Sequence, residues 1–160
     1  DHKDEDGDDC KYLVIDFPIT IIGESKDGCK IIGGLQMKGK KEDNVNVKNL
    51  TISQSKESGV VGYEGMSFHL FHVNIEKSEG NGVWVFGTKR NTMSSCQVRH
   101  SKESGVGVNR IGLITMNGSG TSIHTNATGG YSNKYGLNTY STTNYGLYSY
   151  SSSSIHLVSG

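Results

Sequence analysis

The sequence predicts an all-β fold, a parallel β-solenoid with coils of about 23 residues. The first observation is an internal repeat, because residues 49–60, 72–83 and 95–106 align with one another at a step of 23 residues. The second is the alternation of apolar and polar residues within each copy, which is the period of a strand with one buried face. The third is the glycine that punctuates each copy. Short strands of this kind, without the leucine–asparagine pattern of leucine-rich repeats, are typical of chains that stack each turn on the one before.

Four columns of apolar residues follow from this alignment, and we expect all of them to point inward and to stack one coil apart. They are Val47, Leu70, Met93 and Met116; Leu50, Val73 and Cys96; Ile52, Ile75 and Val98; and Val60, Val83 and Val106. A two-residue insertion near residues 118–120 shifts the next copy. We therefore expect Ile123 to continue the column of Ile52, and Ile155 to open a further turn.

Two further columns consist of small residues. A glycine column suits a corner between strands, where the backbone needs either a positive φ or a close approach to its neighbour. A serine column, continued by Asn126, suits the preceding bend, where the side chains can bond backbone groups of neighbouring turns. The columns are Gly59, Gly82 and Gly105, and Ser55, Ser78 and Ser101.

These stacked apolar, Ser/Asn and Gly positions resemble the right-handed parallel β-helix of the pectin-lyase-like superfamily. The segment ITIIGESKDGCKIIGG (residues 19–34) is similar to the first coils of that superfamily and of uncharacterised β-helix repeat proteins of algae and related protists. The resemblance covers residues 15–123 and extends toward Val158. It implies a right-handed coil but no single activity, because the superfamily holds lyases, hydrolases, epimerases, phage spikes and non-enzymatic modules.

The charges and apolar runs exclude two kinds of partner. Sixteen basic and sixteen acidic side chains cancel, so no global field directs the chain to nucleic acid. The longest apolar stretch, from Tyr12 to Ile22, is interrupted by Asp16 and Pro18 and is too short to span a bilayer, so we expect no membrane insertion. Since the chain begins with Asp1, we expect a processed protein or a fragment of a longer one.

The chain divides into an acidic N-terminal segment (residues 1–10), a parallel β-helix (11–130) and a C-terminal segment rich in Tyr, Ser and Gly (131–160) that is expected to form further coils. The last segment repeats itself at a ten-residue step. Tyrosines with this spacing can form a binding or packing surface, and the alternative is solvated low-complexity chain. The tyrosines proposed to contact a second copy, another chain or a polysaccharide are Tyr135, Tyr140, Tyr145, Tyr148 and Tyr150.

Cysteines and sequons add two candidate modifications. A disulfide between Cys10 and Cys29, with Cys96 buried, is compatible with the sequence, and so are three free thiols. Of the three sequons, the one at Asn117 lies in the irregular insertion and is the best candidate for a glycan, whereas Asn126 lies in an inner column and Asn49 opens a copy of the repeat.

The feature most like an active site is an outward column of Ser53, Glu76, Arg99, His124 and His156. A carboxylate, a cation and an imidazole on one sheet could bind or deprotonate a sugar acid, but unlike charges one coil apart also form a purely structural ladder.

Other candidate groups are weaker. Every aspartate lies at or before Asp43, and Glu57 and Glu103 share a corner column where solvated charges are expected. His69 and His72 lie three residues apart on a strand and cannot share a metal. We therefore expect neither a metal nor a cofactor.

The sequence favours a non-catalytic structural or adhesive module of a larger extracellular, cell-surface or virion-surface protein, which assembles with itself or binds glycan. The alternative is a lyase or epimerase that acts on acidic polysaccharide through Glu76, Arg99 and His124. An ice-binding plane is the least favoured of the three, since the column of Thr51, Asn74, Gln97 and Ser122 is not a uniform threonine array.

Overall fold

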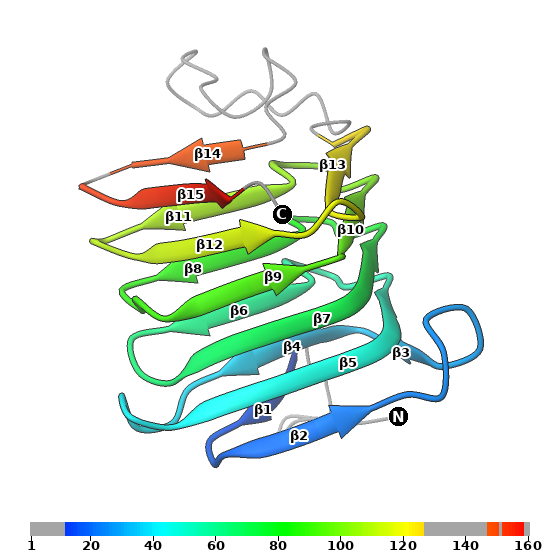
Figure 1. Cartoon of the computed structure of the whole chain (residues 1–160), viewed down its shortest axis with the longest axis horizontal. Helices are drawn as coiled ribbons and strands as arrows, with labels where there is room; N and C mark the ends of the chain where they lie inside the picture. The colour runs from blue at the N-terminus through cyan, green and yellow to red at the C-terminus, as the bar shows by residue number, and fades with distance from the viewer. Residues whose placement is uncertain (1–11, 127–146, 151, 159–160) are drawn as a thin grey trace.

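The computed structural model describes residues 12–126, 147–150 and 152–158 of the chain. Within these ranges the fold is a right-handed parallel β-helix without helices, as the sequence predicts (Figure 1). Every strand pairing is parallel, for example between β5 and β7 and between β8 and β11. The strands are β1 (Tyr12–Ile15), β2 (Ile19–Ile22), β3 (Lys30–Ile32), β4 (Gly34–Met37), β5 (Asn44–Ser53), β6 (Val60–Tyr63), β7 (Ser67–Glu76), β8 (Val83–Phe86), β9 (Asn91–Ser94), β10 (Gln97–Arg99), β11 (Val106–Asn109), β12 (Leu113–Asn117), β13 (Ser122–His124), β14 (Leu147–Ser149) and β15 (Ser154–Val158).

The coils present three faces. The first face is the six-stranded sheet β1-β4-β6-β8-β11-β14. The two long strands β5 and β7 bend midway, at Asn49 and His72, so that their two halves belong to different faces. Their first halves lie with β2, β9, β12 and β15 on the second face, and their second halves lie with β3, β10 and β13 on the third face, at the right of Figure 1.

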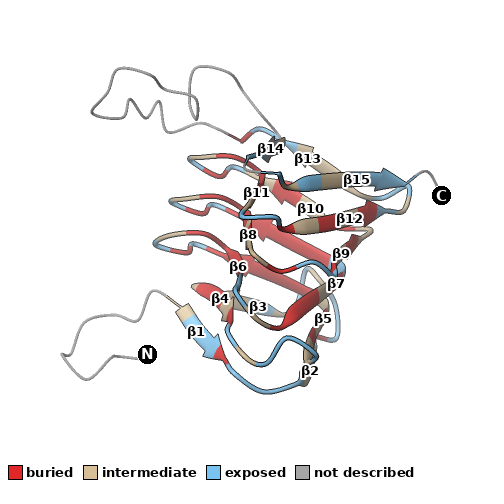
Figure 2. Cartoon of the chain, turned by 90° about the vertical axis from the view of Figure 1, so that its left-hand side faces the viewer, coloured by how far each residue is buried: buried red, intermediate tan, exposed pale blue. Residues whose placement is uncertain are grey.

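The register of the strands confirms the predicted inward columns. Val47 pairs with Leu70, Leu70 with Met93, and Met93 with Met116. The column of Ile52, Ile75 and Val98 continues to Ile123, as the two-residue insertion predicts. Ile155 opens a further turn, because β15 stacks on β12. Figure 2 shows the buried residues concentrated in the middle coils, while the first and last strands carry exposed residues.

The glycine column lies where it was predicted, but only one of the two predicted reasons for glycine holds. The described glycines with a positive φ are Gly33, Gly87 and Gly118, and none of them belongs to the column. The close approach is real: a Cβ on Gly59 would lie 2.5 Å from the Cγ2 of Ile75 and 2.8 Å from the carbonyl oxygen of Gly82. Glycine is required here because the backbone of each coil packs against its neighbour.

Residues other than glycine make most of the left-handed corners, and the repeat places them in columns that the sequence analysis did not identify. The corner between the second and third faces uses Asn49, His72 and Ser95, with φ between 53° and 54°. The corner after the third face uses Gln54, Lys77, His100 and Thr125, with φ between 53° and 59°. Hydrogen bonds to the next coil hold these strained residues, for instance from the N–H of Lys77 to the carbonyl of Arg99 (3.2 Å).

The serine column is buried, but its hydroxyls do not all reach the next turn. The Ser55 hydroxyl donates to the carbonyl of Ser58 in its own bend (2.7 Å). Asn126 does make the predicted bonds between coils, since its Oδ1 accepts from the N–H of Ser101 (3.0 Å) and its Nδ2 donates to the carbonyl of Val98 (3.0 Å). The longer amide side chain spans a distance that the serine hydroxyl does not.

Several predicted features lie outside the described residues: the acidic segment with Cys10, the tyrosines 135, 140 and 145, and the side chain of Tyr148. The cysteine pairing therefore stays a prediction. Cys29 is half-buried against the core, and its sulfur accepts a hydrogen bond from the N–H of Glu24 (3.2 Å). Tyr150, which follows β14, is 62% exposed.

The close packing of the glycine column can be tested with Gly82→Ala. A Cβ at this position would overlap the Cγ1 of Val98 and lie 2.6 Å from the carbonyl oxygen of Gly105. We expect the free energy of unfolding to fall by about 1 to 3 kcal/mol in chemical denaturation. The matched control is Gly120→Ala, where the nearest atom would lie 3.6 Å away, and it should be close to neutral. Equal effects of the two substitutions would contradict this packing.

Candidate functional site

The structure places four of the five predicted outward residues in one column of the third face. Ser53, Glu76, Arg99 and His124 are register partners on β5, β7, β10 and β13. His156 is not in this column, and its predicted place was wrong. It pairs with Thr115 on the second face, because β15 stacks on β12 and not on β13.

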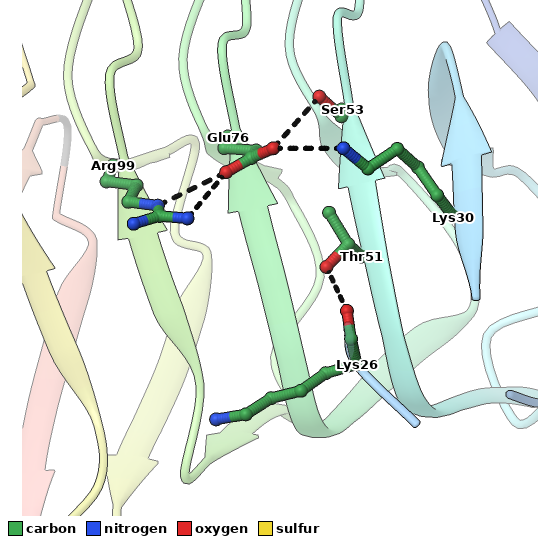
Figure 3. A network of polar contacts seen from close by, with 6 residues as sticks. All are labelled: Lys26, Lys30, Thr51, Ser53, Glu76 and Arg99. Carbon is green, nitrogen blue, oxygen red and sulfur yellow. Dashed lines mark hydrogen bonds and ion pairs between the residues drawn. The ribbon is translucent and has the colours of Figure 1, made fainter. Parts of the chain in front are cut away.

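Glu76 is the centre of this column and its carboxylate is fully engaged (Figure 3). Its Oε2 accepts two hydrogen bonds from Arg99, from Nη2 at 2.8 Å and from Nε at 3.2 Å. Its Oε1 accepts from the Nζ of Lys30 (3.3 Å) and from the hydroxyl of Ser53 (3.4 Å). We call Lys30, Ser53, Glu76 and Arg99 the Glu76 cluster. It ties together four strands of the third face.

Lys30 is the member of the cluster that sequence reasoning missed. It lies on β3 and is the register partner of Thr51, not of Ser53. The step from Lys30 to its partner Thr51 is shorter than 23 residues, so the repeat alignment could not place Lys30. Its long side chain then reaches Glu76 two coils away.

Its neighbours keep the Glu76 carboxylate ionised and hydrogen-bonded, as is typical of a carboxylate that stabilises the fold. Burial by itself would raise the pKa of this carboxyl, but the hydrogen bonds and charges of Arg99 and Lys30 outweigh the burial and leave the pKa lowered. A base must have a free lone pair and a pKa close to the working pH. Glu76 has neither, so this geometry suits it to bridging and not to proton abstraction.

His124 is adjacent to the Glu76 cluster in the register but makes no hydrogen bond or ion pair with Glu76. It is exposed, and its Nδ1 shares a hydrogen bond with the neighbouring Thr125 hydroxyl (3.0 Å). The structure thus brings Glu76 and Arg99 together and leaves the imidazole apart from them.

The expectation that Glu57 and Glu103 are solvated corner charges was wrong. Both are partly buried. The Oε2 of Glu103 accepts from the Nδ2 of Asn81 (2.8 Å), and the Oε2 of Glu57 accepts from the hydroxyl of Tyr12 (3.2 Å). Burial raises the pKa of Glu103 and repulsion by Glu57 adds to it, against the lowering effect of Asn81, while burial raises the pKa of Tyr12 to about 12. Polar side chains of other coils cover these carboxylates, which is why sequence alone did not show their burial.

The two histidines of the second face are separated by the corner. His69 hydrogen-bonds Thr92 (2.9 Å) and Asn44 (3.2 Å) through its two ring nitrogens, and His72 is exposed at the left-handed bend. Among the described residues no group of three or more His, Cys, Asp or Glu side chains could hold a metal ion. The same residues include no helix long and apolar enough to cross a membrane.

Sequence reasoning also missed a groove at the corner between the first and second faces. Its volume is about 770 Å³. It is formed where successive turns follow β6, β8 and β11, and we call it the basic groove. The lining residues are Lys41, Glu64, Gly65, Ser67, Gly87, Thr88, Lys89, Arg90, Arg110 and Ile111. Glu64, Gly87 and Arg110 share one repeat position, but the charge at that position differs from one copy to the next, so no charged column marks the groove.

A stack of flat side chains lies beside this groove. The rings of Tyr63 and Phe86 are parallel, with centroids 4.9 Å apart and planes 5° from parallel. The guanidinium of Arg110 lies 4.4 Å from the centroid of Phe86 and pairs with the Oε1 of Glu64 at 2.8 Å. Outward residues of adjacent coils are spaced by the strand separation of about 4.8 Å, which is also the spacing at which flat groups stack.

Of the sequons, Asn126 is buried with both amide groups bonded, and Asn117 is exposed at the end of β12. A glycan on Asn117 stays a prediction, and the geometry leaves Asn126 without a free amide nitrogen to modify.

A family model described as "Right handed beta helix region" matches residues 19–159. No curated protein and no solved structure matches the chain. The match agrees with the stacked coils and describes no ligand or reaction.

The bridging role of Glu76 predicts a pH-dependent cost for Glu76→Gln. The pKa of this carboxyl is lower in the folded chain than its ordinary value of 4.5, so its stabilising effect is present above 4.5 and is lost as the pH falls through the folded value. We expect a loss of about 1 to 2 kcal/mol in urea unfolding at neutral pH, because Lys30 and Arg99 remain partly exposed and screened. The difference in the free energy of unfolding between the wild type and Glu76→Gln should become smaller at acid pH, where the wild-type carboxyl is also uncharged.

The matched control is Glu79→Gln, which removes an exposed ion pair with Lys102 and should cost less than about 1 kcal/mol. The bridging role would be refuted by equal losses in the two variants, or by a loss in Glu76→Gln that stays constant through the acid range.

Proposed function

Since the chain belongs to the right-handed beta helix family, we propose that it is a non-catalytic structural or adhesive module of a larger extracellular or surface protein. The kinship with the pectin-lyase-like superfamily that the sequence suggests is part of this proposal, and the coil length and the small-residue columns support it.

The observation that carries the proposal is the engagement of the Glu76 carboxylate. In the only outward column that combines a carboxylate, a cation and an imidazole among the described residues, the carboxylate accepts four hydrogen bonds from the protein itself. A substrate would have to displace Arg99 or Lys30 from it at a cost in stability. The arrangement therefore supports a scaffold more than a reaction centre.

The C-terminal tyrosines complete the proposal with a contact surface. A solenoid exposes unpaired strand groups at its ends, and natural proteins cover or charge such edges. The described part of the last coil carries exposed apolar residues, with Leu157 69% and Val158 51% exposed. We propose that this end, together with the five tyrosines of the C-terminal segment, contacts a second copy, another chain or a polysaccharide.

The absence of catalysis is tested by incubating the protein with uronic-acid polysaccharides and following the ultraviolet absorbance of unsaturated products. We expect no product above a heat-treated sample, because the Glu76 carboxylate is held by its own partners. Product formation that disappears in Glu76→Gln, Arg99→Ala or His124→Ala would replace the scaffold with the rival assignment, a lyase or epimerase.

The contact surface is tested by sedimentation velocity on the full chain and on a variant in which the five tyrosines are replaced by serine. We expect the full chain to self-associate in a concentration-dependent way and the variant to do so more weakly, since tyrosines bury large apolar faces with bonded hydroxyls. A full chain that sediments as a monomer at all concentrations, like the variant, would remove self-assembly from the proposal.

A further inference from the structure

The basic groove has an excess of cationic side chains at its surface. Four of its lining residues are cationic, Lys41, Lys89, Arg90 and Arg110, and one is acidic, Glu64. Glu64 is paired with Arg110. None of the ion pairs among the described residues engages Lys41, Lys89 or Arg90, and the Nη2 of Arg90 donates instead to the backbone carbonyl of Lys41. Three positive charges therefore face the groove without a carboxylate partner in the described part of the chain.

The backbone holds these cations close together. Lys89 and Arg90 follow one another in the turn after β8, and Arg110 lies in the equivalent turn one coil further along. The bond from Arg90 to the carbonyl of Lys41 ties the loop after β4 to the same corner. The charge of Arg90 also acts on a neighbouring strand, since burial and then this charge lower the pKa of His69. The site is thus prearranged for an anion.

The neighbouring stack limits what kind of anion suits the groove. Surfaces that bind single-stranded nucleic acid offer free aromatic faces on which bases stack. Here one face of the Phe86 ring is covered by Tyr63 and the other by the guanidinium of Arg110. The ring edges and the apolar side chain of Ile111, which is 58% exposed, remain at the rim. Such a rim suits the apolar C–H edges of sugar rings.

The acidic member of the groove fits the same ligand. The exposed carboxylate of Glu64 uses one oxygen for Arg110, and a carboxylate has several further acceptor positions. Sugar hydroxyls can donate to them, whereas a polyanion without hydroxyl donors would only be repelled. Lys41 lies two coils before Lys89 and Arg90, so the unpaired cations are spread along the axis of the coils, which suits a linear polymer better than a single small anion.

We propose that the basic groove binds a segment of acidic polysaccharide, with Lys41, Lys89 and Arg90 at its acid groups and Glu64 at its hydroxyls. This inference deepens the proposed function by naming a ligand and a site, and it rests on that function only in stating that the ligand is not cleaved.

The test is isothermal titration calorimetry of the full chain with polygalacturonate, dextran sulfate, uncharged dextran and duplex DNA. We expect binding to one or both of the acidic polysaccharides, with an affinity that falls as salt is added. Polygalacturonate and dextran sulfate distinguish carboxylate from sulfate as the recognised group. Neutral dextran and DNA should bind at least about tenfold more weakly.

The site is tested with the double variant Lys89→Gln/Arg90→Gln, which should weaken binding of the acidic polysaccharide about tenfold. The matched control is Lys56→Gln/Lys102→Gln, which removes the same net charge from another corner of the coils and should change affinity less than about twofold. Lys89→Gln alone serves as a second variant, because Lys89 is exposed and makes no hydrogen bond or ion pair through its side chain within the described part of the chain. Thermal unfolding of each variant checks that it is folded.

Equal losses in the groove and control variants, equally tight binding of DNA or dextran, or no binding to either acidic polysaccharide would overturn the inference. A failure of the proposed function looks different, since it would appear as cleavage of a polysaccharide and not as a change of affinity in the groove variants.

Discussion

The whole structure depends on the hydrogen-bond register between successive coils. Each coil pairs with the next in parallel, so a residue at one position of a coil lies over the residue at the same position of the coil before. An inward position is therefore apolar in nearly every coil, and a polar residue such as Asn91 is tolerated there because its amide is hydrogen-bonded. A corner likewise repeats its backbone conformation from coil to coil. This constraint explains why left-handed residues as different as Asn49, His72 and Ser95 share one corner. A left-handed backbone is strained in each of these residues, and the hydrogen bonds between coils offset that strain.

The same constraint acts on the outer surface. Outward side chains of adjacent coils lie about 4.8 Å apart, so each must attract, stack on or avoid its neighbour. Glu76 and Arg99 attract, and Tyr63 and Phe86 stack. Where cations of different columns meet at a corner without an acidic partner, as at Lys89 and Arg90, the surface is available to an outside ligand. The spacing that stabilises the fold thus also sets the distance between the groups that the proposed polysaccharide would contact.

The sequence predicted most of the fold because its signal is periodic. The inward columns, the insertion before Ile123 and the outward pairing of Glu76 with Arg99 all follow from counting residues. Features that depend on irregular segments did not follow. Lys30 reaches Glu76 from a coil of different length, and β15 places His156 on the second face after a long connection. The basic groove was missed for another reason. Glu64, Gly87 and Arg110 share one repeat position but differ in charge, and Lys89 and Arg90 have no charged counterpart in the neighbouring copies. Glu103 is partly buried because the side chain of Asn81 from the preceding coil hydrogen-bonds to it, and such a contact between coils cannot be read from composition.

The register between coils is tested most directly by removing one coil. Deleting residues 90–112 takes out one full repeat, so Leu113 falls in the position of Arg90 and every later column stays aligned. The account predicts a shorter protein that still unfolds cooperatively, as followed by circular dichroism during urea denaturation. Deleting one residue fewer, 90–111, shifts the later strands by one position and turns Ile114 and Met116 outward, so cooperative unfolding should be lost. Equal behaviour of the two deletions would contradict the account.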